Sequence, residues 1–154
     1  ILILGGSLGD STINQTLSER LDVIRANPEV QFIWQTGKIY IDQVREAITN
    51  TTGEAVRNPR ISAIPNLYVT DFIKDMANAY AAADLVISRA GAGSISEFCL
   101  LHKPVILVPS PNVAEDHQTK NALALVDKGA AIYVKDVEAK EKLLPVALET
   151  IANF

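Results

Sequence analysis

The amino-acid sequence predicts an α/β fold, a parallel sheet flanked by helices. Short runs of β-branched residues and leucine alternate with longer amphipathic segments, which is the pattern of strand–helix units in a parallel sheet. Two of these runs, residues 85–87 and 105–108, are apolar at every position. Strands that helices cover on both faces have this composition, so the two runs mark the middle of the sheet.

The strands are expected at residues 1–5, 30–35, 61–64, 67–70, 84–88, 104–108 and 131–134. The helices are expected at about 11–26, 39–50, 74–82, 93–102, 117–128 and 138–152. In the first helix, apolar residues recur at spacings of three and four from Ile13 to Ile24, so one stripe faces the sheet. Pro28 ends that helix, and the polar residues 51–60 form a surface loop. This order predicts a Rossmann-like sheet, which binds ligands outside the carboxyl ends of its strands.

Length and composition are those of one soluble domain. A chain of 154 residues buries about two-thirds of its unfolded surface without disulfides or metals. It is 48% hydrophobic and 21% charged, and it has neither a signal peptide nor an apolar run of about 18 residues. We therefore expect a cytoplasmic protein. Because the chain begins inside a strand and without methionine, we also expect it to be part of a longer protein.

The charge balance narrows the choice of ligands. A formal net charge of -4 and a pI of about 5.1 leave no basic stripe for a nucleic acid, so any bound phosphate must be held locally. The single cysteine, Cys99, has no disulfide partner, and the two histidines have no cysteine at a zinc-binding spacing. The sequence therefore predicts no nucleic-acid partner, no internal disulfide and no structural metal.

A glycine-rich loop follows the first predicted strand and reads Gly5-Gly6-Ser7-Leu8-Gly9. Glycines let the backbone approach a ligand closely, and the N–H groups at the start of the next helix attract anions. The loop has neither the Walker sequence nor the spacing of a dinucleotide-binding loop. Two interpretations stay open: a loop that binds an anion or a sugar, and a tight strand-to-helix turn.

A stronger signal follows a central strand and reads Ser88-Arg89-Ala90-Gly91-Ala92-Gly93-Ser94-Ile95-Ser96-Glu97. Its small residues expose the N–H groups of a first helical turn, which would hold phosphate oxygens. Glu97 lies about one turn further on, where its carboxylate would accept hydrogen bonds from the two hydroxyls of a ribose. The alternative is a capping box, in which Ser94 is the N-cap and Glu97 bonds back to its N–H group.

Polar residues also follow the next central strand, in the run Pro109-Ser110-Pro111-Asn112-Val113-Ala114-Glu115-Asp116-His117-Gln118-Thr119-Lys120-Asn121-Ala122. Two prolines stiffen the exit from the strand, and carboxylate, imidazole and amide groups open the next helix. Such groups bind sugar hydroxyls. The alternative is a helix capped by Asp116 with a solvated polar face. His117 has no evident serine or cysteine nucleophile beside it, which argues against a catalytic base.

Phe72 and Ile73 follow the predicted strand at 67–70. An apolar rim with backbone polar groups can enclose a flat base and bind its edge. Core packing explains the same two residues, and we expect Trp34 in the core.

In chain order, these segments are Gly-Gly-Ser-x-Gly, Phe-Ile-x-x-Met, Arg-x-Gly-Ala-x-Ser-x-x-Glu and Pro-(x)6-Asp-His-Gln-x-x-Asn-Ala. Together they resemble the C-terminal domain of the MurG family of peptidoglycan N-acetylglucosaminyltransferases, in glycosyltransferase family 28 with the GT-B fold. The resemblance covers essentially the whole chain. It implies that residues 1–154 are the donor-binding domain of a two-domain enzyme whose N-terminal acceptor domain lies outside this chain.

The resemblance also implies roles for single residues. Ile73 would bind uracil through its backbone, and Glu97 would bind the ribose. The phosphates would lie on the helix start formed by Gly91, Ala92, Gly93 and Ser94, with Ser7 facing them. His117 and Gln118 match a pair that binds N-acetylglucosamine hydroxyls; the pair can be two glutamines in this family, so the histidine adds a protonation state. Further possible contacts are Gly6, Phe72, Arg89, Asp116 and Asn121.

The reaction that the resemblance implies is an inverting transfer from UDP-N-acetylglucosamine to the 4-hydroxyl of lipid-linked N-acetylmuramoyl-pentapeptide. Helix dipoles would stabilise the departing UDP, so no metal or other cofactor is expected. The base and the membrane-contacting patch would lie in the N-terminal domain. This chain would then bind the donor without turnover, and the full-length enzyme would be peripheral on the cytoplasmic face of the bacterial inner membrane.

Two alternatives stay open. The first is another UDP-sugar enzyme of the same fold, either a UDP-sugar hydrolase or the catalytic subunit of a two-chain N-acetylglucosaminyltransferase. The second is a non-enzymatic nucleotide-binding α/β module, whose glycines are only turns. A module of that kind would not prefer UDP-N-acetylglucosamine to UMP.

Overall fold

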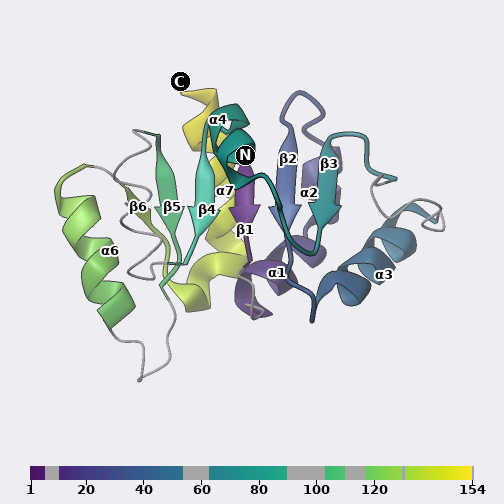
Figure 1. Ribbon diagram of the computed structural model, residues 1–154, viewed down its shortest axis with the longest axis horizontal. Coiled ribbons are helices and arrows are strands. Elements are labelled where there is room, and N and C mark those ends of the chain that lie inside the picture. Colours follow the sequence, from purple (N-terminus) through teal and green to yellow (C-terminus); the bar gives the residue numbers. More distant parts are fainter. Residues whose placement is uncertain (6–10, 54–62, 90–102, 110–116, 130, 154) are drawn as a thin grey trace.

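A computed structural model describes residues 1–5, 11–53, 63–89, 103–109, 117–129 and 131–153. Within these ranges, six strands form one parallel sheet with helices on both faces (Figure 1). The predicted fold class is therefore confirmed. Among the described residues, no helix is both long and apolar enough to span a membrane.

The strands are β1 (Leu2–Leu4), β2 (Phe32–Gln35), β3 (Leu67–Thr70), β4 (Val86–Ser88), β5 (Val105–Leu107) and β6 (Ile132–Tyr133). The helices are α1 (Ser11–Ser18), α2 (Leu21–Arg25), α3 (Ile41–Thr52), α4 (Met76–Ala82), α6 (His117–Asp127) and α7 (Ala139–Ala152), and η2 (Asp136–Glu138) is a short 3-10 helix. The predicted helix at 93–102 lies outside the described residues. The predicted helix at 11–26 is two helices, yet its apolar stripe from Ile13 to Ile24 is buried as expected.

One predicted strand is wrong in its described part. Residues 63 and 64 of the predicted strand 61–64 form a bend, and a turn closed by the Leu67 N–H group and the Ile64 carbonyl follows at 3.1 Å. Pro65 lies in that turn and has no N–H group for a strand ladder. Ile64 is nonetheless fully buried, so its apolar character reports core packing rather than a strand.

The sheet has the order β3-β2-β1-β4-β5-β6, which is that of a doubly wound Rossmann sheet. β2 and β3 are added outward on one side of β1, and the chain then crosses to β4 on its other side. The boundary between β1 and β4 is the point at which such sheets bind ligands, outside the carboxyl ends of the strands. These ends point to the lower edge of the sheet in Figure 1.

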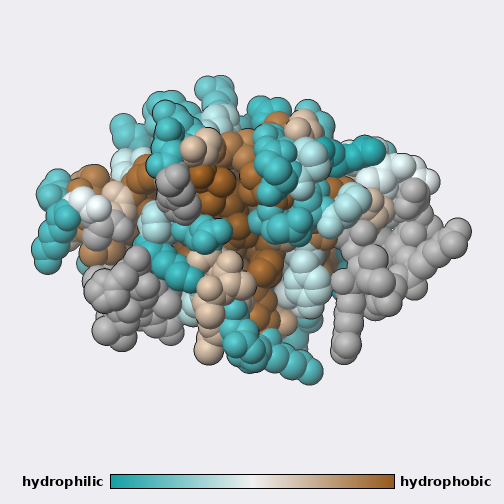
Figure 2. Space-filling model, turned by 90° about the horizontal axis from the view of Figure 1, so that it is seen from above, coloured by the Kyte–Doolittle hydropathy of each residue, from teal (hydrophilic) through white to brown (hydrophobic). Residues whose placement is uncertain are grey.

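Two apolar layers hold the helices to the sheet. Alternate strand residues such as Ile3 and Trp34 pack under α1, α2, α3 and α7, while Leu2 and Val86 pack on the opposite face with α4 and α6. All four are fully buried, and burial of a large apolar side chain contributes about 1.5–3 kcal/mol. The prediction that Trp34 belongs to the core is confirmed. Figure 2 looks at the opposite edge, where the strands begin, and shows apolar residues in the middle with polar residues around them.

Candidate functional site

The carboxyl edge of the sheet gathers the segments that the sequence singled out. Gly5 follows β1, residues 71–73 follow β3, Arg89 follows β4 and Pro109 follows β5. Because β1 and β4 are hydrogen-bonded neighbours, with Leu2 opposite Val86, the glycine-rich loop and the Arg89 motif leave the sheet side by side. β5 lies next to β4, so the third motif begins beside the second.

A neutral, buried group of polar residues joins β1, β2 and α1; we call Gly5, Asn14, Trp34, Gln35 and Thr36 the Asn14 cluster. Asn14 accepts a hydrogen bond from the Trp34 indole N–H group at 2.9 Å and donates one to the Thr36 carbonyl at 2.8 Å. The Gly5 N–H group donates to the Gln35 carbonyl at 2.8 Å. The cluster fixes the point at which the glycine-rich loop begins.

The first glycine of that loop is required by packing. A Cβ atom on Gly5 would collide with the Asn14 side-chain oxygen and would lie 2.9 Å from the Gln35 carbonyl oxygen. Close packing against Asn14 and Gln35 therefore accounts for this glycine. Gly6 and Ser7, with the rest of the loop, lie outside the described residues.

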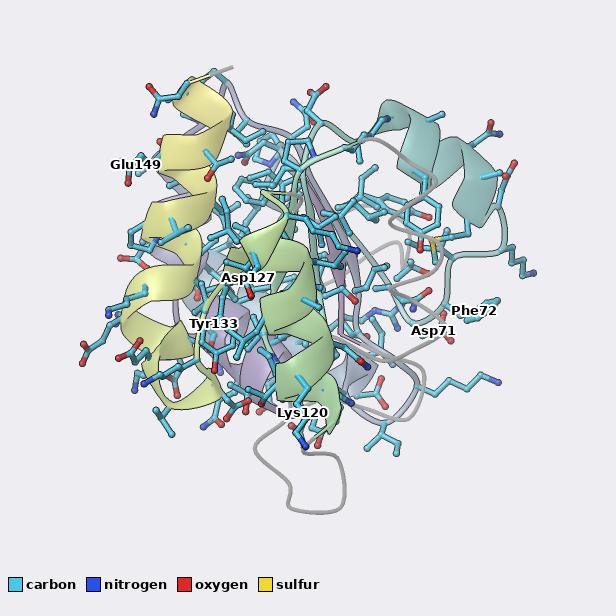
Figure 3. The ribbon with its side chains drawn as sticks, turned by 90° about the vertical axis from the view of Figure 1, so that its left-hand side faces the viewer. Asp71, Phe72, Lys120, Asp127, Tyr133 and Glu149 are labelled. Carbon is cyan, nitrogen blue, oxygen red and sulfur yellow. The ribbon has the colours of Figure 1, made fainter. Side chains whose placement is uncertain are left out.

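Phe72 and Ile73 lie beside an open pocket of about 670 Å³ at the carboxyl end of β3. The Ile73 N–H group donates to the Gln35 side-chain oxygen at 2.9 Å, and the Phe72 N–H group donates to the Asp71 carboxylate at 2.8 Å. Phe72 is 52% exposed, so core packing is wrong for this residue, whereas Ile73 packs partly against the core. Figure 3 shows Asp71 and Phe72 together on the side of the molecule away from α7.

A charged group of residues lies where β4 and β5 end; we call Thr12, Arg89, Val108, Pro109 and Asp136 the Arg89 cluster. The Arg89 guanidinium donates to the Asp136 carboxylate at 2.6 Å and to the carbonyls of Val108 and Pro109 at 3.0 and 3.1 Å. The Thr12 hydroxyl donates to the other Asp136 oxygen at 3.1 Å. Arg89, which the sequence suggested as a ligand contact, is thus engaged within the protein.

The third motif opens α6. His117 and Gln118 are the first two residues of this helix, and Asn121 follows His117 by four residues, which puts both on one helix face. Figure 3 shows Lys120 at the lower end of α6 and Asp127 further up, so the helix starts at the carboxyl edge. The backbone therefore brings His117 and Gln118 to the same edge as the other motifs.

Gly6, Ser7, Gly91, Ala92, Gly93, Ser94, Glu97 and Asp116 lie outside the described residues. Their described neighbours in the chain, Gly5, Arg89, Pro109 and His117, all lie at the carboxyl edge. In the ranges that the structure describes, no three histidine, cysteine, aspartate or glutamate side chains form a group that could hold a metal ion.

The sequence reasoning missed Asn14, Gln35 and Asp136. Asn14 stands in an apolar helix face, where a polar residue must find a buried partner, and this was the available signal. Gln35 ends an otherwise apolar strand at the ligand-binding edge. Asp136 had no such signal, because its partner Arg89 is 47 residues away in the chain.

Strand order and the points at which the motifs begin define a domain of the doubly wound, Rossmann-like α/β class. The family model described as the glycosyltransferase family 28 C-terminal domain matches residues 1–154. The chain belongs to this family.

Curated relatives agree with this assignment. The chain is 76% identical over 153 residues to the UDP-N-acetylglucosamine–N-acetylmuramyl-(pentapeptide) pyrophosphoryl-undecaprenol N-acetylglucosamine transferase of Bacteroides fragilis, covering 99% of this chain and 38% of the relative. It is 71% identical to the protein of the same name from Bacteroides thetaiotaomicron, with the same coverage. The chain thus spans about two-fifths of the length of these relatives.

Solved structures share the fold. The crystal structure of Acinetobacter baumannii MurG matches with a TM-score of 0.70 and 32% identity, over 98% of this chain and 40% of that one. A solution structure of ALG13 matches with a TM-score of 0.58 and 23% identity, over 87% of this chain and 76% of that one. At that identity, the second match supports the fold alone.

Proposed function

We propose that this chain is the donor-binding domain of an N-acetylglucosaminyltransferase and binds UDP-N-acetylglucosamine at the carboxyl edge of its sheet. The proposal rests on the arrangement around β1 and β4 in a chain of this family. The glycine-rich loop and the Arg89 motif start from these two neighbouring strands, at the point where doubly wound sheets bind ligands. The names of the curated relatives include the same donor, UDP-N-acetylglucosamine.

Each part of the donor has proposed ligands. The diphosphate lies between Ser7 and the backbone N–H groups of residues 91–94, with no metal or other cofactor, since helix N–H groups and the helix dipole can stabilise it. Glu97 accepts hydrogen bonds from the ribose. His117 and Gln118 bind the N-acetylglucosamine hydroxyls, with Asp116 and Asn121 beside them.

Uracil is assigned to Ile73, next to the exposed ring of Phe72. Because the Ile73 N–H group donates to Gln35, we assign the contact with the base to the Ile73 carbonyl, which can accept from uracil N3–H. Gln35 thereby fixes the backbone of Ile73 on its amino side, one peptide group before this carbonyl.

The full-length protein would catalyse inverting transfer to the 4-hydroxyl of lipid-linked N-acetylmuramoyl-pentapeptide, in peptidoglycan synthesis. This chain spans 38% of such relatives, so we place the acceptor site and the base outside it and expect donor binding without turnover. The full-length protein would be peripheral on the cytoplasmic face of the inner membrane.

Calorimetric titration of the chain with UDP-N-acetylglucosamine, UDP-glucose and UMP tests this proposal. We expect saturable binding with a preference for UDP-N-acetylglucosamine. Glu97→Ala should weaken it by about 1.5–3 kcal/mol, roughly 10- to 150-fold, because a hydrogen bond to a charged group is lost. The exposed α3 residue Glu46 gives a matched control, Glu46→Ala, which should bind normally.

A thermal melt must show that the Glu97 variant is folded. If Glu97 serves only in a capping box, the variant loses about 0.5–2 kcal/mol of stability and keeps its affinity, which would refute its role. Equal binding of UMP and the UDP-sugars would favour a non-enzymatic nucleotide-binding module. No binding of any uridine nucleotide would contradict the proposal for this chain.

A further inference from the structure

We propose that Asp136, through Arg89, is a positioning residue for the donor site: their ion pair sets the relative placement of the three segments that carry the binding motifs. This inference rests on the proposed function but concerns residues that do not themselves contact the donor. It assigns Arg89 a role other than that of a ligand contact.

The contacts of the Arg89 cluster reach each of the three segments. Thr12 lies in the first turn of α1, directly after the glycine-rich loop, and bonds to Asp136 at 3.1 Å. Arg89 is the residue from which the phosphate-binding motif 90–97 continues. The Pro109 carbonyl, 3.1 Å from the guanidinium, belongs to the residue that begins the sugar-binding motif. One carboxylate and one guanidinium thus join the anchor points of all three motifs.

Asp136 lies in a short helix that is connected directly to the hydrophobic core. It opens η2, which leads directly into α7, and α7 packs its buried residues Ala139 and Leu143 into the larger core layer. The side chains of Arg89 and Asp136 are only 19% and 13% exposed, so solvent screens their attraction weakly. A charge-assisted hydrogen bond of 2.6 Å in this setting holds the guanidinium in one orientation.

The orientation matters because the guanidinium also fixes two peptide groups. The carbonyls of Val108 and Pro109 both point at its Nη1 atom, which sets the direction in which the chain leaves β5. Binding sites must hold their groups to within about 0.5 Å, and supporting residues provide this accuracy. Without Asp136, the guanidinium loses the charged partner that orients it toward both carbonyls.

Asp136→Asn is the most informative variant because it removes the charge and keeps the size and an acceptor for Thr12. We expect it to weaken binding of UDP-N-acetylglucosamine roughly two- to thirty-fold, the range seen for residues that act through others. Amide hydrogen exchange of residues 90–94 and 110–113, measured without ligand, should become faster. Asp136→Glu, which keeps the charge, should restore part of the affinity.

Glu138→Gln is the matched control. Glu138 also lies in η2, but it pairs with Lys142 within the same part of the chain, and this pair is 41% and 56% exposed. It should change neither affinity nor exchange in those segments.

A purely structural role would leave a different signature. Asp136→Asn would then lower the unfolding midpoint, yet the folded protein would keep wild-type affinity and wild-type exchange at 90–94 and 110–113, and that result would overturn the proposal. If the wild-type chain binds no UDP-N-acetylglucosamine, the proposed function fails for this chain. The exchange comparison still decides the inference in that case: unchanged exchange rejects it, and faster exchange supports it.

Discussion

Two polar clusters lie at the same edge of the sheet and differ in charge and exposure. The Asn14 cluster is neutral, and its Asn14 and Trp34 side chains are 2% and 0% exposed. The Arg89 cluster contains a full ion pair that keeps some contact with solvent. Both satisfy their polar groups with partners distant in the chain, and among the described residues no buried side-chain nitrogen or oxygen lacks a partner.

This difference in charge and exposure indicates different roles: the Asn14 cluster supports the fold, and the Arg89 cluster supports the candidate site. A buried neutral network fixes how elements pack, because any unmet group in it is costly where water cannot enter. The Asn14 cluster accordingly joins β1, β2 and α1, the centre of one layer. The Arg89 cluster joins the anchor points of the motif segments, where the chain leaves the sheet. Substitutions in the first should therefore lower stability, and substitutions in the second should mainly lower donor affinity.

The largest loss of stability is expected from Asn14→Leu. The Trp34 indole N–H group and the Thr36 carbonyl would both stay buried without a partner, at about 1–3 kcal/mol each, or roughly 2–6 kcal/mol together. Urea unfolding measures the loss in the free energy of unfolding. The adjacent and exposed Gln15 offers the control Gln15→Leu, which should change stability little. A loss below about 1 kcal/mol would show that the network does not hold the fold.

Gly5→Ala should have the next largest effect. Its new Cβ would press on Asn14 and on the Gln35 backbone, and such overpacking costs about 1–3 kcal/mol. A double-mutant cycle with Asn14→Ala tests whether the two residues interact, because removing the Asn14 amide relieves one of the two collisions. We expect the combined loss in free energy of unfolding to be smaller than the sum. Strict additivity would mean that Gly5 and Asn14 do not interact.

The smallest effect is expected from Lys140→Ala, which removes an ion pair outside both clusters. Lys140 and Glu19 are 2.8 Å apart but 60% and 37% exposed, so the pair should stabilise little. The hydrogen bond from Lys140 lowers the pKa of Glu19, and that pKa should rise in the variant. Because the folded-state pKa is lowered, any stabilisation is present at neutral pH and lost as the pH falls through it.

Titration of the Glu19 carboxyl by NMR checks this prediction. An unchanged Glu19 pKa in the variant would contradict the assigned cause. A loss of stability as large as that of Asn14→Leu would remove the distinction between exposed pairs and the buried network.

The sequence predicted the fold well because parallel strands carry a local signal. The runs at β4 and β5 are apolar on both faces, and the glycine and proline segments mark where strands end. The error at residues 63 and 64 arose because apolar residues in a bend look like a short strand when periodicity is the only guide.

The candidate site was only partly predictable. The predicted residues His117, Gln118 and Ile73 lie at the carboxyl edge because they stand next to strand or helix ends in chain order. The supporting contacts were not: Asn14 with Thr36, and Arg89 with Asp136, connect residues 22 and 47 positions apart. Such pairs follow from strand order, which places β2 beside β1, and β4 and β6 on either side of β5, and no local pattern encodes that order.

The most direct test of the account is to map donor binding onto the edges of the sheet by amide NMR during titration with UDP-N-acetylglucosamine. We expect the largest shifts at the carboxyl edge, at Ile73, Arg89 and Gln118. Asn66 and Lys103, which precede β3 and β5 at the opposite edge, should be unaffected. Shifts concentrated around Asn66 and Lys103, or none at saturating donor, would contradict a donor site at the carboxyl edge.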